Sequence, residues 1–380
     1  MNKEIITFQV SQMSISEELR SVANKIIDLQ RISVEECLVL YHCSDLPLLG
    51  ILANYINKEK NKGKVYFNRN FHIEPSNVCR YNCKFCSYRK SEIEGYVLSK
   101  EEIINLVRKH NTEGVTEVHI VGSAHPERDI VFYEDLLKSI RKEAPRLHKK
   151  AFSAIELYSI FELSNVSINE GLTRLKNAGL QSIPGGGAEI FDETIRKQIC
   201  NDKADANFWL EIHKTAHQLG LSSNATMLYG HIESYENRID HMDKLRSLQD
   251  ETNGFNAFIP LKFLHSNNEM SNIEESSIVE DMKNFAVSRI FLDNIQHIKA
   301  YWPMLGKEEA SLSLNFGVDD LDGTIDDTTS IYTTAGSKEQ SPKISTEELI
   351  KIIQENNRIP VERDSKYMTI KEFRADIERR

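Results

Sequence analysis

From residue 64 onward, short apolar runs alternate with amphipathic helical segments, and this order constrains the fold more than any other feature of the sequence. Helices between successive strands imply parallel pairing with right-handed crossovers. The pattern therefore predicts an α/β fold whose sheet closes into a complete or partial (β/α) barrel. The predicted strands are Val65–Ile73, Glu117–Gly122, Lys150–Ile155, Ser182–Gly185, Ser223–Tyr229 and Phe255–Phe263.

The regions on either side of this alternation differ from it. Residues 1–62 show apolar residues at helical spacing and are expected to form an N-terminal helical segment. The barrel core is expected over residues 63–300, where Ser288–Ile295 is expected to add a further strand. Residues 301–380 are expected to form a C-terminal extension that packs on the barrel. Within it, residues 310–323 mix apolar and acidic side chains without a clear period.

Three cysteines, Cys79, Cys83 and Cys86, follow the first predicted strand at the spacing Cys-x-x-x-Cys-x-x-Cys. Thiols that merely pack in a core have no reason to keep a fixed spacing in a polar loop. Thiolates select iron–sulfur clusters, zinc or copper. Structural zinc sites and electron-transfer clusters normally take four protein ligands. A set of three leaves one iron of a cluster open, which is the arrangement needed to bind and reduce S-adenosylmethionine.

A zinc site is the alternative interpretation of the cysteine motif, and it would need a fourth ligand. Cys37, Cys43, Cys200 and His72 are the candidates, and none lies at a paired spacing with the three cysteines. A zinc-bound triad would make the chain a non-catalytic metal-binding module. Metal analysis separates the two interpretations.

Composition and charge limit the kinds of partner that the protein can bind and the compartment in which it can work. The formal net charge is -10, whereas a nucleic-acid enzyme usually shows a basic face. The sequence has no apolar run long enough to span a membrane and no signal-peptide pattern at its start. Its six cysteines do not resemble a disulfide framework. We therefore expect a cytoplasmic protein that binds neither nucleic acid nor membrane.

Small residues follow two of the predicted strands, and barrel enzymes place their chemistry at the carboxyl ends of strands. Gly122 and Ser123 follow the second strand, where a ligand could approach exposed backbone N–H groups. The run Gly185-Gly186-Gly187 follows the fourth strand. It is not a P-loop, because no Gly-Lys-Ser/Thr follows it. Each stretch could also be an ordinary turn.

Ionisable residues at the same strand ends add further candidates. Glu156 follows the third strand and Glu189 follows the glycine run, so either carboxylate could accept ribose hydroxyl groups. His231 ends the fifth strand, where it would suit general acid–base work or carboxylate recognition. The alternative is that the glutamates are solvated surface charges and that the histidine is structural.

A polar and aromatic cluster occupies residues 289–302. Such a set could hold an aromatic carboxylate, with Arg289 or Lys299 on the acid and Tyr301 or Trp302 on the ring. The alternative is a salt-bridged surface helix.

The cysteine motif, with Phe85 before its last cysteine, resembles the signature of the radical S-adenosylmethionine superfamily. The similarity extends to one family, the aminofutalosine (aminodeoxyfutalosine) synthases of the futalosine route to menaquinone, over residues 67–363. It rests on six segments, His72–Asn77, Ala151–Glu156, Ser182–Phe191, Ala225–Glu233, Leu248–Thr252 and His297–Trp302. Dehypoxanthine futalosine cyclases and deazaflavin-precursor synthases are close relatives that share the glycine run.

The resemblance implies a TIM-like barrel and a defined reaction. A 4Fe–4S cluster on Cys79, Cys83 and Cys86 would bind S-adenosylmethionine and generate a 5′-deoxyadenosyl radical. The radical would add to the double bond of 3-(1-carboxyvinyloxy)benzoate, and rearrangement with decarboxylation would give aminofutalosine. A reducing partner such as flavodoxin or ferredoxin is implied. The cyclase, which begins by hydrogen abstraction, or a deazaflavin-type enzyme is the alternative.

The resemblance also suggests roles for individual residues. Phe85 and Tyr88 would flank the adenine, with Gly122 and Ser123 near the methionyl end. Glu156 and Glu189 would take the ribose hydroxyls beside Gly185, Gly186 and Gly187. The candidates for holding the substrate carboxylates or assisting decarboxylation are His231, Arg289 and Asn77.

Overall fold

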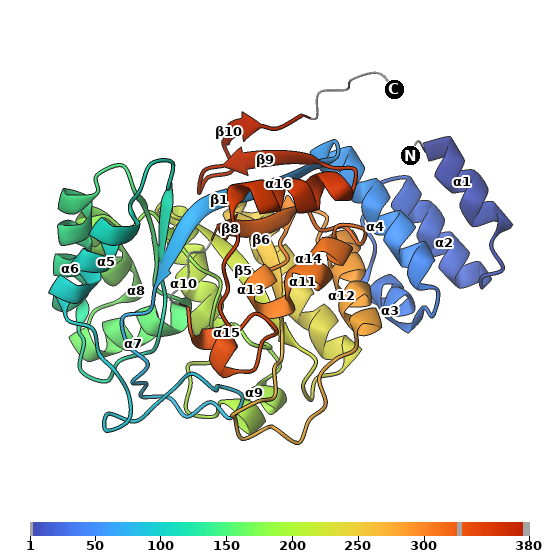
Figure 1. The fold of residues 1–380 in the computed structure, drawn as a ribbon. Helices are drawn as coiled ribbons and strands as arrows, with labels where there is room; N and C mark the ends of the chain where they lie inside the picture. Colours follow the sequence, from blue (N-terminus) through green and yellow to red (C-terminus); the bar gives the residue numbers. More distant parts are fainter. Residues whose placement is uncertain (1–2, 325–328, 375–380) are drawn as a thin grey trace.

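A computed structural model describes residues 3–324 and 329–374, and it shows helices arranged around a curled sheet (Figure 1). The chain begins with α1 (Lys3–Gln12), α2 (Glu17–Ile27), α3 (Val34–His42) and α4 (Leu46–Asn61). The sheet strands that follow are β1 (Lys64–Ile73), β2 (Glu117–Ile120), β3 (His148–Ala151), β4 (Ser182–Ile183), β5 (Ser222–Tyr229), β6 (Phe255–Lys262), β7 (His297–Ile298) and β8 (Asp320–Thr324).

Helices connect these strands and cover the outer face of the sheet. They are α5 (Lys100–His110), α6 (Ile130–Glu143), α7 (Ala154–Ser164), α8 (Ile168–Ala178), α9 (Glu193–Ile199), α10 (Ala206–Gln218), α11 (Tyr235–Thr252), α12 (Ile278–Phe291), α13 (Trp302–Leu305) and α14 (Lys307–Ser313). The chain ends with α15 (Ile331–Thr334), α16 (Thr346–Glu355), β9 (Ile359–Arg363) and β10 (Thr369–Glu372).

The sheet runs in chain order from β1 to β7, and each neighbouring pair is parallel. Strand β8 pairs in parallel with β1, and a bridge between Lys299 and Asp320 joins β8 to the chain that leaves β7. The strand order therefore returns to its start, and the predicted (β/α) barrel is confirmed. Strand β9 pairs with the first half of β1, and β10 lies antiparallel to β9 outside the barrel.

Local signals in the sequence explain where many helices begin and end. Ser99 accepts a hydrogen bond from the Glu102 N–H, and the Glu102 carboxylate accepts one from the Ser99 N–H, which closes a capping box on α5. The same arrangement opens α3 and α7. Helix α11 ends at Asn253, which takes a left-handed conformation that asparagine tolerates well.

The region that was expected to form a strand at Ser288–Ile295 is instead the end of helix α12, which runs to Phe291. The last two turns of this helix, from Phe285, are buried throughout. A helix buried on every side has a nearly continuous apolar sequence, which periodicity alone cannot distinguish from a buried strand.

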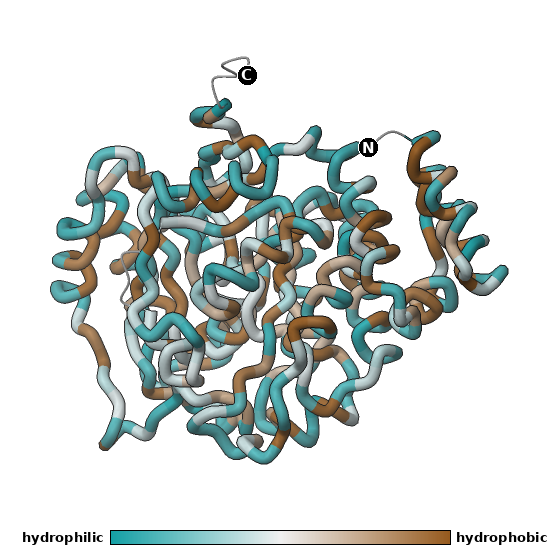
Figure 2. Tube along the Cα trace, turned by 45° about the vertical axis from the view of Figure 1, so that its right-hand side comes forward, coloured by the Kyte–Doolittle hydropathy of each residue, from teal (hydrophilic) through white to brown (hydrophobic). Residues whose placement is uncertain are grey.

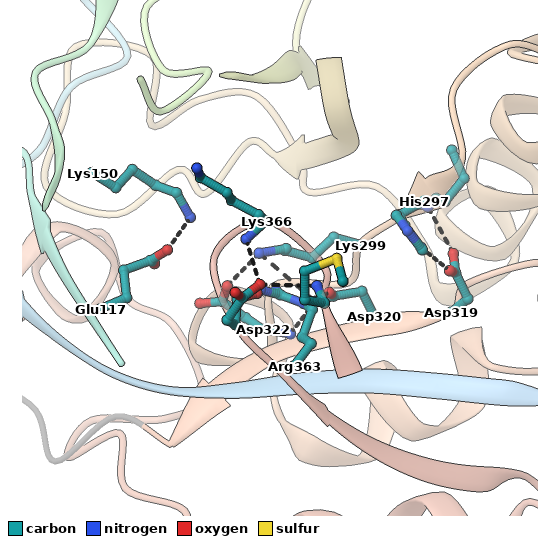
Figure 3. Close-up of polar contacts among 12 residues, drawn as sticks. Glu117, Lys150, His297, Lys299, Asp319, Asp320, Asp322, Arg363 and Lys366 are labelled. Carbon is teal, nitrogen blue, oxygen red and sulfur yellow. Dashed lines mark hydrogen bonds and ion pairs between the residues drawn. The ribbon is translucent and has the colours of Figure 1, made fainter. Parts of the chain in front are cut away.

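Strand β8 lies inside the segment that was expected to form a C-terminal extension, so the boundary at residue 300 does not follow the sheet. Its sequence, Asp320–Thr324, is acidic, and it gave no strand signal. The structure buries its carboxylates against cations (Figure 3). Asp320 binds Arg363 at 2.7 Å and Asp322 binds Lys299 at 2.5 Å.

The N-terminal helices pack on the barrel beside α11 and α12. The Tyr41 hydroxyl donates to Asn284 Oδ1 at 2.7 Å across this contact, and both side chains are buried. Arg31 binds Asp250 at 2.5 Å and Asp293 at 2.9 Å at its edge. Figure 2 shows apolar stretches along the strands and helix faces, with hydrophilic turns at the periphery. Among the helices of the described ranges, none has the length and apolar character that a membrane crossing requires.

Replacement of Arg363 by methionine tests the buried ion pair that holds β9 to β8. The change should lower the free energy of unfolding by about 3–5 kcal/mol, because it leaves the buried Asp320 carboxylate with the longer contact to Lys299 at 3.7 Å in place of its ion pair with Arg363. Urea denaturation followed by circular dichroism measures the loss. Lys244→Ala, which removes the exposed pair with Asp240, is the control and should cost about 0.5 kcal/mol or less. Equal losses in the two variants would contradict the prediction.

Candidate active site

A cavity of about 290 Å³ opens at the carboxyl ends of the barrel strands and continues into the barrel interior. Residues from the loops after successive strands form its wall, as expected for a (β/α) barrel. Twelve of the residues singled out in the sequence lie on this wall. They are Cys79, Cys83, Phe85, Cys86, Tyr88, Gly122, Ser123, Glu156, Gly185, Gly186, Gly187 and Glu189.

The cysteine loop, residues 79–86, is held in place by backbone groups from other strand ends. The Arg80 N–H donates to the Ala124 carbonyl at 2.9 Å, which ties the loop to the chain after β2. The Lys84 N–H donates to the Ile199 carbonyl at 2.8 Å, at the end of α9. The loop contains no helix or strand of its own, so these contacts fix its position beside the cavity.

The three thiols are suited to hold a cluster. Cys83 is buried, and Cys79 and Cys86 are partly exposed on the cavity wall. Burial raises the pKa of Cys83 and of Cys79, while the charge of Lys203 lowers both in part. Thiolate ligation by a loop of this kind is the chemistry of iron–sulfur sites, in which each cysteine binds its own iron. Within the described ranges, no three His, Cys, Asp or Glu side chains converge on a single metal ion. A cluster does not require such convergence, because its irons are separate from one another.

Lys203 is a wall residue that the sequence analysis missed. Its ammonium group forms a buried ion pair with Glu189 and lies 5.6 Å from the centre of the Phe85 ring. Glu189 therefore has a strong partner already, and any ribose hydroxyl would share its carboxylate with Lys203. Nothing in the sequence around Lys203 marked it, because both contacts are formed with residues distant along the chain.

Two of the three glycines in the glycine run stand where close packing leaves no room for a side chain. A Cβ on Gly185 would lie 2.7 Å from the Asn224 carbonyl oxygen, and a Cβ on Gly187 would lie 2.4 Å from Ile155 Cγ1. Gly187 also has a φ of +90°, a backbone conformation that residues with a side chain rarely adopt. Gly186 has more space, with its nearest contact 3.5 Å away. The run thus lets the loop after β4 pack closely against β5 and α7.

Glu156 lies on the wall but is engaged by its own loop. Its carboxylate accepts hydrogen bonds from the Ser153 N–H at 2.8 Å and from the Gly122 N–H at 3.1 Å. Burial raises its pKa to about 7, although these hydrogen bonds favour the charged form. The side chain therefore joins the loops after β2 and β3.

Ser123 and Tyr88 connect the segment before the cysteines to the rest of the wall. The Ser123 hydroxyl lies 2.6 Å from the Val78 carbonyl and 2.9 Å from the Ser76 carbonyl. The Tyr88 hydroxyl donates to the same Ser76 carbonyl at 3.1 Å. Both side chains face the cavity while their polar atoms position the loop.

Glu74, just after β1, binds the segment that leads into α15. Its carboxylate accepts hydrogen bonds from the hydroxyls of Thr329 at 2.6 Å and Ser330 at 2.7 Å. Thr329 and Tyr332 line the cavity. The acidic side chain thus fixes the part of the wall that follows β8, the strand beside β1.

Three sequence candidates do not lie on the cavity wall. Arg289 is fully buried between α12 and the start of β8, where it binds Asp319 and donates to the Gly317 carbonyl at 2.8 Å. The His231 ring is buried, 3.2 Å from the Glu233 carboxylate. Asn77 accepts a hydrogen bond from the Tyr96 N–H. All three polar groups have partners within the fold. The structure does not place them on the cavity wall, and a role in holding the substrate carboxylates remains a prediction.

The barrel floor supplies residues in their place. Lys150, Lys299 and Tyr301 line the cavity together with His72 and His119. Only Lys299 and Tyr301 belong to the cluster noted in the sequence. The signal for the others was hidden because they lie inside predicted strands, where a polar residue looks like a solvent-facing position.

Comparisons with known proteins identify the family. Residues 73–245 match the radical SAM superfamily, and residues 252–376 match the region described as the CofH/MqnC C-terminal region. The chain is 40% identical over 356 residues to an aminodeoxyfutalosine synthase from Thermus thermophilus, which covers 92% of this chain and 95% of that protein. The chain belongs to the radical SAM superfamily.

Further comparisons place the chain within this superfamily. An aminodeoxyfutalosine synthase from Streptomyces coelicolor is 36% identical over 93% of this chain and 94% of its own length. A cyclic dehypoxanthine futalosine synthase from the same organism is 33% identical over 93% of this chain and 90% of its own length. The crystal structure of a methylornithine synthase has the same fold, with a TM-score of 0.72, 16% identity, and coverage of 89% and 97%. The chain is therefore a radical SAM enzyme of this group, which implies a 4Fe–4S cluster and S-adenosylmethionine.

The raised pKa of Glu156 predicts a specific pH dependence of stability. A carboxyl group whose pKa is 4.5 when unfolded and about 7 when folded binds more protons in the folded state between these values. Stability is therefore lost as the pH rises through this window, by about 3 kcal/mol for this group. Urea denaturation of the cluster-free protein should show Glu156→Gln gaining that amount relative to wild type between pH 4.5 and 8. A constant difference at every pH would contradict the assignment.

Proposed function

We propose that this enzyme is an aminodeoxyfutalosine synthase. When bound, the cluster and S-adenosylmethionine supply the 5′-deoxyadenosyl radical that adds to the enol-ether double bond of 3-(1-carboxyvinyloxy)benzoate, before rearrangement and loss of carbon dioxide give aminofutalosine. The observation that carries the proposal is the cavity itself. It joins the three cysteines to the predicted cofactor residues on the strand-end loops, in a chain similar along nearly its whole length to proteins of that name.

The residues of the chain would divide the work by position. Cys79, Cys83 and Cys86 would hold the cluster, and Phe85 beside Lys203 would offer a flat apolar surface for the adenine ring. Glu156 and Glu189 would accept the ribose hydroxyls. The cavity reaches into the barrel, so its walls would keep water and stray hydrogen donors from the reacting groups.

The reaction also needs an electron, for which we infer a small one-electron donor such as flavodoxin or ferredoxin. The partly exposed thiols of Cys79 and Cys86 put the cluster site within reach of the surface. A reducing cytoplasm would suit both the free cysteines and the cluster.

Anaerobic turnover followed by mass spectrometry tests the function. Reconstituted enzyme, reductant, S-adenosylmethionine and 3-(1-carboxyvinyloxy)benzoate should give a product that keeps the whole adenosyl group and has lost carbon dioxide. Free 5′-deoxyadenosine with unchanged substrate would instead favour the cyclase or a deazaflavin-type enzyme. Protein that carries a full cluster but does not cleave S-adenosylmethionine would exclude the radical reaction.

Replacement of Cys83 by alanine should abolish both the cluster and activity, because the loop then offers only two thiolates. Iron analysis and the visible absorbance of the reconstituted protein measure the loss independently of turnover. Cys37→Ala is the matched control, since Cys37 is equally buried but lies in helix α3. The control should retain its iron, and an iron-replete, active Cys83→Ala protein would refute the assignment.

A further inference from the structure

The floor of the cavity is built from polar residues on neighbouring strands. His72 of β1 is in register with His119 of β2, and His119 is in register with Lys150 of β3. Side chains in lateral register on paired strands point to the same face, and all three line the cavity. Lys299 and Tyr301, just after β7, complete this floor. We call these five residues the floor cluster.

Both lysines of the floor cluster are buried and paired with carboxylates (Figure 3). Lys150 lies 2.8 Å from Glu117, and Lys299 lies 2.5 Å from Asp322. An ammonium group has three N–H donors, so each lysine can bind a further acceptor beside its carboxylate partner. A buried ion pair adds little stability over apolar packing. Two such pairs at one cavity leave N–H donors available to a ligand, whatever they also contribute to the barrel seam.

The rings of the floor cluster offer a matching surface for an aromatic ligand. His72 and Tyr301 lie with their rings nearly parallel, and the Tyr301 hydroxyl is 3.4 Å from His72 Nδ1. The Tyr332 ring, which also lines the cavity, lies 5.2 Å from the Tyr301 ring. Nε2 of His119 is buried and has no hydrogen-bond partner among the described residues. The site thus combines aromatic ring faces, lysine side chains and an imidazole nitrogen that can bind a further group. This combination suits a planar aromatic acid better than a sugar.

Depth in the cavity decides which end of the substrate reaches the floor. His72 is part of β1, whereas the three cysteines follow that strand by at least six residues, on the loop at the carboxyl end of the barrel. In the proposed reaction the double bond must meet the adenosyl group near those cysteines. The aryl carboxylate, at the far end of the substrate, then points away from them.

We propose that Lys150 and Lys299 form the subsite that binds the aryl carboxylate of the substrate, with Tyr301 and His72 against its ring. This inference rests on the proposed function for the orientation of the substrate. Burial lowers the pKa of Lys150, and a bound carboxylate would offset that cost by favouring the ammonium form. The subsite selects for a carboxylated ring, and it positions the substrate without touching the reacting bond.

Binding of unreactive analogues to the reconstituted full-length enzyme tests the subsite. The probes are 3-(1-carboxyethoxy)benzoate, which has both carboxylates, 3-ethoxybenzoate, which has only the aryl carboxylate, and 2-phenoxypropanoate, which has only the side-chain carboxylate. None has the double bond, so calorimetry under anaerobic conditions measures affinity without turnover. The variants remove each ion pair as a unit, as Lys150→Met/Glu117→Gln and Lys299→Met/Asp322→Asn, so that no buried charge is left unpaired.

Each paired variant should weaken the binding of the two probes that carry an aryl carboxylate by about a hundredfold. The affinity for 2-phenoxypropanoate should stay unchanged. Lys149→Met is the matched control, since Lys149 is buried on the same strand but donates to the Leu147 carbonyl at 2.6 Å and does not line the cavity. It should bind all three probes as wild type does. Equal weakening of every probe, weakening of 2-phenoxypropanoate alone, or no weakening would overturn the subsite.

The turnover experiment separates this inference from the proposed function. The enzyme could form no adenosylated product and still bind aryl carboxylates selectively through the floor lysines. That result would support the subsite and contradict the proposed substrate. Adenosylated product formed with equal kcat/KM by wild type and both paired variants would keep the function and remove the subsite.

Discussion

The closure of the barrel depends on carboxylates that are neutralised inside it. Asp319, Asp320 and Asp322, at the start of β8 and within it, are buried, and each meets a cation or a histidine from another element. Without those partners, an acidic segment would stay in water, because an isolated buried carboxylate costs several kcal/mol. The cations come from α12, β9 and the chain after β7, so the place of β8 in the sheet depends on segments that lie outside it.

This constraint connects the fold to the site. The ion pair between Lys299 and Asp322 belongs both to the barrel seam and to the cavity floor. In the same way, the contacts that hold the cysteine loop come from the ends of other strands, so the cluster site is formed by the closed barrel and not by the loop alone. Glu74 extends the pattern to the other wall, where it fixes the chain that leads into α15. Positioning and stability share the same buried polar groups.

The candidates that lie off the cavity wall illustrate what a sequence pattern cannot resolve. His231 and Arg289 stood out because they are polar and follow or precede apolar runs. The structure pairs both with carboxylates away from the cavity. Lys150, inside a predicted strand, and Lys203, in a stretch with no motif, gave no signal in the sequence, yet both line the cavity. In each case the decisive fact is which carboxylate shares the burial of the charge, and a local pattern does not show that pairing.

The sequence by itself determined the order of the first six strands, the helices between them and the cysteine motif, because these are recorded in local apolar period, capping residues and fixed spacing. The same local signals marked the glycine run and the strand ends where the wall residues lie. Only the tertiary structure decided that an acidic segment forms the eighth strand, that two of the three glycines serve packing, and that buried lysines form the cavity floor. The reason is physical: whether a charged side chain faces water, a counter-ion or a cavity is set by residues that the local sequence does not contain.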